Sequence, residues 1–194
     1  RVTGVQTCAL PILEYYKGIF TTLSSCASRQ LEEVTFRRAT ISVPELMATA
    51  GKYFRKVYKG NKAHIDFKIQ PLEGRITGDW NQLRFLLENL IDEACSVTLD
   101  GAVCLSARED GEFIRFLFTD MRREKTREEL NQLFYPDLSR MTAGEKGELY
   151  GTEYLVCKQI IRDHDEFAGR RGCRINAEPG KEGGFTIYFT LPKK

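Results

Sequence analysis

The residues best suited to chemistry lie along one amphipathic segment, residues 81–97. Its apolar side chains share one stripe at helical spacing, and that stripe must face a core. Asn89 and Glu93 lie one helical turn apart at the rim of the stripe, and Asp79 stands just before the segment. Amide and carboxylate oxygens in this arrangement can bind a cation or contact a phosphate. The same pattern is typical of a solvent-exposed helix edge. Taken alone, the pattern favours this interpretation over a binding site. The stripe comprises Leu83, Leu86, Leu87, Leu90, Ala94 and Val97.

Cysteine and histidine offer little further chemistry. The five cysteines beyond residue 12 are irregularly spaced, form no Cys-x-x-Cys pair and have no histidine nearby. This argues against a zinc site and against a disulfide framework. Free thiols in apolar surroundings are typical of a reducing compartment, so we expect a cytoplasmic location. For His64 and His164 we expect structural or solvent-facing roles.

Composition narrows the class of protein. The chain has 194 residues, 42% hydrophobic and 29% charged, which is typical of a globular domain and too apolar for a disordered one. The net charge of +2 gives no field that would favour nucleic acid as the partner. No apolar run approaches the roughly 18 to 20 residues that span a bilayer.

Periodicity predicts α/β units around a mixed sheet, preceded by a helical segment at residues 13–39. A long charged stretch, residues 120–151, separates the last helix from the preceding strands and holds one short helix with a capping box from Thr126 to Glu129. Strands are predicted at residues 41–43, 64–70, 75–77, 102–108, 113–119, 173–177 and 185–191, and longer helices near 44–59, 81–97 and 152–164.

Several stretches resemble, in order and spacing, the ATP-binding domain of sensor histidine kinases. That domain has the Bergerat fold, which gyrase and the mismatch-repair and chaperone ATPases share. The resemblance implies a two-layer sandwich of a mixed five-stranded sheet and about three helices, with an N-terminal helical arm. It covers residues 41–192. The stretches are Gly78 to Ala94, similar to the N box; Phe116 to Asp120; Leu133 to Pro136, similar to an aromatic lid box; Gly151 to Ile161; and the closing hairpin Arg174 to Pro192.

The resemblance also implies a nucleotide site with ATP and Mg²⁺ as cofactors. By resemblance, Asp120 accepts a hydrogen bond from the adenine amino group, and Asn89, Gly151 and Lys158 contribute to nucleotide binding. Asn89 and Glu93 are the implied metal ligands, and Glu93 stands where the family has a second asparagine that meets magnesium. The resemblance identifies no catalytic residue.

The chain departs from the family pattern at its glycines. After Asp120 the family has an Asp-x-Gly-x-Gly pattern, whereas this chain has Met121-Arg122-Arg123-Glu124, whose side chains would crowd a nucleotide. Arg122 and Arg123 are candidates for direct phosphate contact. Two functions therefore stay open: phosphoryl transfer from ATP to a histidine, and a pseudokinase of the same fold with lost or impaired ATP binding. A gyrase-like ATPase would need a helix glutamate as general base, and Glu88 lies on the wrong face.

We expect three parts along the chain. Val2 to Ile12 resembles a translated sequencing adapter, so residues 1–12 are set aside. Residues 13–39 are a helical connector or the end of a dimerisation helix, and residues 40–194 are the ATP-binding domain. The expected partners are ATP, an upstream dimerisation and phosphoacceptor domain, a response regulator and a second copy in the full-length protein. That protein could be the cytoplasmic part of a membrane-anchored sensor.

Overall fold

The computed structural model describes residues 36–59, 62–135, 152–181 and 183–194. Its compact unit begins at Phe36. Residues 1–35 and Gly151, on which part of the sequence prediction rests, lie outside the described residues. Within the described ranges, no helix combines the length and the apolar character needed to cross a membrane.

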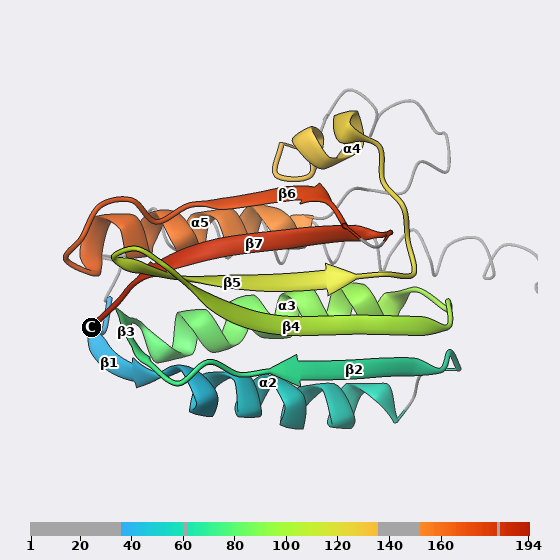
Figure 1. The fold of residues 1–194 in the computed structure, drawn as a ribbon, viewed down its shortest axis with the longest axis horizontal. Coiled ribbons are helices and arrows are strands. Elements are labelled where there is room, and N and C mark those ends of the chain that lie inside the picture. The colour runs from blue at the N-terminus through green and yellow to red at the C-terminus, as the bar shows by residue number, and fades with distance from the viewer. Residues whose placement is uncertain (1–35, 60–61, 136–151, 182) are drawn as a thin grey trace, which may run out of the picture. The chain divides into compact units, whose positions relative to one another are not determined.

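A mixed five-stranded sheet forms one layer, as predicted (Figure 1). Its strands, in spatial order, are β2 (Ile65–Gln70), β4 (Gly101–Asp110), β5 (Phe113–Asp120), β7 (Phe185–Pro192) and β6 (Ile175–Pro179). Only the β2–β4 pairing is parallel. Gly111 takes a φ of 61° in the turn between β4 and β5, which explains why a glycine suits that hairpin.

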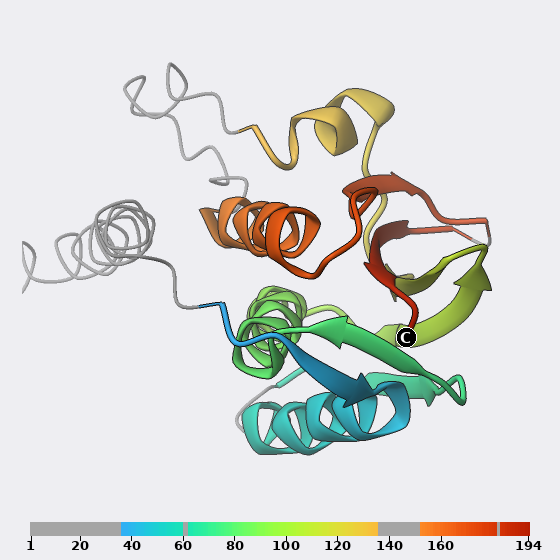
Figure 2. The same ribbon diagram turned by 90° about the vertical axis from the view of Figure 1, so that its left-hand side faces the viewer.

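Three long helices form the second layer, against one face of the sheet (Figure 2). They are α2 (Val43–Tyr58), α3 (Trp80–Ser96) and α5 (Thr152–Phe167), and the short α4 (Arg127–Gln132) follows β5. The predicted capping box of α4 is present, with Thr126 and Glu129 each accepting a hydrogen bond from the other's backbone N–H. This arrangement is the two-layer α/β sandwich that the resemblance implied.

The core lies between the layers and follows the alternation of the strands. On β5 every second side chain is buried: Ile114, Phe116, Phe118 and Asp120. Phe116 stacks on Phe189 of β7 with ring centroids 5.0 Å apart. The predicted stripe of α3 is buried from Leu83 to Ala94, whereas Val97 forms the C-cap and is only half-buried. Because β5 ends on a buried position, the Asp120 side chain lies between the sheet and α3.

The first residues of the unit differ from the prediction. The helix predicted over residues 13–39 does not continue through residues 36–38, and Ala39 begins strand β1 (Ala39–Ser42), which pairs with β3 (Arg75–Gly78). The physical reason is a tertiary contact, because the Arg37 backbone N–H donates to the Asp79 carboxylate at 2.7 Å and not to a helical carbonyl. Helix α5 also runs three residues beyond the predicted end.

His164 is structural, as expected, and joins α5 to the start of α3. It is fully buried, and its Nε2 accepts the Asp79 backbone N–H at 3.0 Å. The ring hydrogen must therefore be on Nδ1, which donates to the Ile160 carbonyl oxygen at 2.7 Å. Burial lowers the pKa of His164, against opposing effects from that hydrogen bond and from Asp79.

A lowered histidine pKa makes stability depend on pH. The unfolded chain protonates His164 near its ordinary pKa of 6.5, while the folded chain resists protonation. The free energy of unfolding should therefore fall as pH drops below about 6.5, with a slope of up to about 1.4 kcal/mol per pH unit. Urea unfolding between pH 7.5 and 5.5 measures this. His164→Gln, which keeps an acceptor facing Asp79, should lose most of the slope, and an equal slope in both proteins would contradict the assignment.

Candidate functional site

A buried ion pair lies at the end of β5. The side chains of Asp120 and Arg122 are both 0% exposed. Arg122 donates from Nε to Asp120 Oδ1 at 2.9 Å and from Nη2 to Oδ2 at 2.8 Å, and its backbone N–H donates to Oδ1 at 3.0 Å. Such a two-pronged guanidinium–carboxylate pair is among the strongest hydrogen-bonded arrangements in proteins.

Arg123 extends this pair to helix α3. Its Nε donates to Asp120 Oδ2 at 3.0 Å, and its Nη1 donates to Glu93 Oε1 at 3.2 Å. The guanidinium also lies 5.3 Å from the centre of the Phe185 ring. Asp120, Arg122, Arg123 and Glu93 thus form one cluster, here called the arginine cluster, with two negative and two positive groups.

The backbone around the cluster is shaped to receive Arg122. Its Nη2 donates to the Ala94 carbonyl at 2.7 Å and its Nη1 to the Leu99 carbonyl at 3.2 Å, so the cation also binds the C-terminal end of α3. Gly101 has a φ of 131°, and a Cβ there would lie 2.9 Å from Arg122 Cγ. Replacing Gly101 would therefore disturb the seat of the Arg122 side chain.

Electrostatics reinforce the pairing. Burial by itself raises the pKa of Asp120, but hydrogen bonds from Arg122 and the charge of Arg123 outweigh it and hold that pKa below its ordinary value. Burial lowers the pKa of Arg123, but Asp120 and other neighbouring groups reverse the shift and keep it raised. Both groups are therefore charged at neutral pH. Burial and the charge of Glu93 raise the pKa of nearby Tyr154, which stays neutral.

The residues implied by the resemblance have different partners in the structure. Glu93 and Asp120 are brought together through Arg123. Asn89 Nδ2 donates to the Phe85 carbonyl of its own helix at 2.8 Å. The Lys158 ammonium lies 3.2 Å from the centre of the Tyr135 ring.

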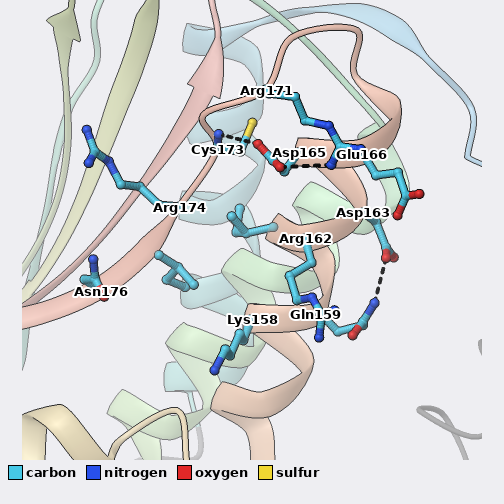
Figure 3. Close-up of a pocket in the computed structure, with 12 residues that line it drawn as sticks. Lys158, Gln159, Arg162, Asp163, Asp165, Glu166, Arg171, Cys173, Arg174 and Asn176 are labelled. Carbon is cyan, nitrogen blue, oxygen red and sulfur yellow. Dashed lines mark hydrogen bonds and ion pairs between the residues drawn. The ribbon is translucent and has the colours of Figure 1, made fainter.

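Lys158 also lines a cavity of about 350 Å³ between α5 and β6 (Figure 3). Arg162 and Asp165 of α5 also line this cavity. So do Arg174, which directly precedes β6, and Asn176, which lies in β6. Asp120 and Glu93 do not line it. It is therefore distinct from the space that the arginine cluster fills.

The arginine cluster does not fit a magnesium nucleotide in the arrangement shown. A carboxylate has about four acceptor positions, and Asp120 already accepts four hydrogen bonds, all from Arg122 and Arg123. No acceptor is left for an adenine amino group. Among the described residues, no group of three or more histidine, cysteine or acidic side chains is placed to hold a metal ion.

Sequence reasoning missed the role of the two arginines. It treated Arg122 and Arg123 as obstacles to a nucleotide or as phosphate contacts, whereas both bind carboxylates of the chain itself. A usable signal was present, because two arginines directly follow a strand whose period buries Asp120, and a buried carboxylate needs a partner. The partner Glu93 could not be found in this way, since it lies 30 residues from Arg123.

Comparison with known proteins agrees with the fold. The family model described as histidine kinase-, DNA gyrase B- and HSP90-like ATPase matches residues 78–194. No curated protein matches the chain.

Several solved structures share the architecture. The nucleotide-free catalytic domain of histidine kinase ThkA is 19% identical with a TM-score of 0.61, over 81% of this chain and 96% of that one. Full-length ShkA in complex with AMPPNP is 16% identical with a TM-score of 0.67, over 100% and 40%. Histidine kinase ThkA in complex with response regulator TrrA is 17% identical with a TM-score of 0.71, over 100% and 53%. At these identities the likeness establishes the fold.

The arginine cluster predicts an asymmetry between two aspartates. Asp120→Asn should lower the free energy of unfolding by about 3–5 kcal/mol, because it leaves the buried Arg122 charge without its counter-ion. The matched change Asp110→Asn breaks the partly exposed pair with Arg115 and should cost less than about 1 kcal/mol. Urea denaturation of both variants gives the comparison. Equal small losses would mean that Asp120 and Arg122 are not a buried pair.

Proposed function

Because the chain belongs to the histidine kinase-, DNA gyrase B- and HSP90-like ATPase family, we propose that it is the ATP-binding domain of a two-component sensor histidine kinase. The family match over residues 78–194 carries this proposal. The likeness of the whole two-layer fold to catalytic domains of histidine kinases supports it. The activity of such a domain is phosphoryl transfer to a histidine, in which positioning and charge neutralisation do most of the work.

The partners follow from this role. ThkA is seen with a response regulator and ShkA with AMPPNP. We assign the same two kinds of partner, a response regulator and an adenine nucleotide, to this chain. We place the histidine that accepts the phosphoryl group outside this domain; His164 is fully buried, and His64 lies directly before strand β2. A dimerisation and phosphoacceptor domain upstream would supply it, in a homodimer of the full-length protein.

A second candidate function is a pseudokinase, and the arginine cluster favours it. Any nucleotide that uses Asp120 must first displace Arg122 and Arg123. Separating a buried pair costs about 3–5 kcal/mol, and each 1.4 kcal/mol lowers affinity tenfold. The penalty is therefore more than a hundredfold in affinity, unless new contacts to the freed arginines offset it. A domain with this penalty would serve signalling through its fold and its protein partners.

Nucleotide protection separates the two candidates. A ligand that binds only the folded state at a hundred times its Kd stabilises that state by about 2.7 kcal/mol, which raises the melting temperature by several degrees. The proposed ATP-binding role predicts such a rise for the full chain in millimolar Mg-ATP, whereas the pseudokinase, with Asp120 fully engaged, predicts none. The measurement is thermal unfolding with and without nucleotide.

No rise would support the pseudokinase, and a clear rise would support the kinase. In that case Asp120→Asn should abolish the rise if the nucleotide uses this carboxylate, whereas the control Asp110→Asn should keep it. A rise that survives Asp120→Asn would place the nucleotide elsewhere on the domain.

A further inference from the structure

The first described residues dock at one end of the two central helices. The Phe36 ring lies edge-on to His164, with ring centroids 4.9 Å apart, and 5.8 Å from the ring of Phe167. The Arg37 backbone N–H donates to Asp79 Oδ2 at 2.7 Å. We call Phe36, Arg37, Asp79 and His164 the N-terminal joint.

Asp79 is the centre of this joint, because it binds three elements at once. Its Oδ1 caps α3 by accepting the Asn81 and Gln82 N–H groups at 2.9 and 3.1 Å. Its Oδ2 holds the segment that precedes β1, and its own N–H donates to His164 of α5. The residue is 4% exposed. The carboxylate and backbone N–H of this one buried residue therefore link the N-terminal segment to the start of α3 and the end of α5.

Close packing leaves the joint little room to slide. A Cβ at Gly78 would lie 2.9 Å from the His164 ring and 3.0 Å from Leu83. The Arg38 guanidinium, at the end of a flexible side chain, lies against Gly169 just after α5. The segment before α3 is therefore packed closely against the His164 ring of α5.

The far ends of the same helices reach the arginine cluster. Glu93 lies 14 residues beyond Asp79, which is about 21 Å along a helix, and it pairs with Arg123. Tyr154 lies in the first turns of α5, is 3% exposed, and interacts electrostatically with Glu93 and Arg123. Each helix thus has one end in the joint and the other beside the cluster.

We infer that the N-terminal joint controls the arginine cluster through α3 and α5. While Asp79 holds residues 36–38 and His164, α3 is kept in the position that pairs Glu93 with Arg123. Displacing residues 36–38 from Asp79 shifts α3 against β5 and loosens the hold of the cluster on Asp120. This inference rests on the proposed function, since it makes the cluster around Asp120 the regulated part of the domain.

Hydrogen exchange at the arginine side chains tests this coupling in the full chain. The Nε–H groups of Arg122 and Arg123 each donate to Asp120, so their exchange, followed by NMR with ¹⁵N-labelled arginine, reports the cluster directly. Asp79→Asn is the most selective change, because asparagine still caps a helix but turns an amide donor toward the Arg37 N–H. Phe36→Ala is the second variant.

The control is Phe54→Ala in α2. Phe54 is buried and stacks on Phe67, away from the joint. Urea concentrations are chosen so that each variant and the control have the same free energy of unfolding. We expect exchange at Arg122 and Arg123 to be about fivefold faster or more in the joint variants than in the control, through local opening. If both joint variants exchange at the same rate as the Phe54→Ala control at matched stability, the coupling is overturned and the joint is purely structural.

This readout requires neither nucleotide nor phosphoryl transfer. Faster exchange without nucleotide protection would keep the joint and reject the kinase activity. Nucleotide protection with unchanged exchange would support the kinase activity and reject the coupling to the joint.

Discussion

The charge of Asp120 is the constraint on which the rest of the site depends. Strand alternation places this carboxylate on the buried face of β5, where an unpaired charge would cost several kcal/mol. Two arginines that follow closely in the chain offset this cost by forming ion pairs with the carboxylate. Their guanidinium groups also bind the Ala94 carbonyl of α3 and the Glu93 carboxylate, and the Arg122 side chain lies close to Gly101. Local geometry on both layers follows from neutralising one side chain.

The chain shares the fold of the histidine kinase ATPases, but arginines of the chain itself lie beside Asp120. The two-layer sandwich matches the histidine kinase ATPase architecture along most of the chain, yet the space beside Asp120 holds two cations of the chain itself. A guanidinium is always charged and presents fixed donors, so the cluster needs no bound ion to be neutral. The same fold can therefore persist while the chemistry of its site changes.

Much of the fold could be predicted from the sequence, because it rests on local signals. Alternation in β5, the apolar stripe of α3, the Thr126 capping box and the Asp110-Gly111 turn are all encoded within a few neighbouring residues. The β1–β3 pair and the non-helical start at Phe36 were not predicted, since both depend on contacts distant in sequence.

The candidate site was harder to predict for the same reason. Asp120 and Glu93 were identified, and the structure places them in one cluster. The prediction could not tell that Asn89 would satisfy its amide within its own helix, or that Arg123 would reach Glu93 across the two layers. Such pairings are set by how α3 packs on β5, and no spacing in the chain encodes that distance.

The most direct test of the account is the ionisation of Asp120 itself. Carboxyl ¹³C NMR of the full chain, titrated with pH in the absence of nucleotide, follows this one group. Pairing with Arg122 and Arg123 predicts a pKa below the ordinary value of 3.8. A pKa at or above 3.8 would contradict the claim that Arg122 and Arg123 pair with this carboxylate.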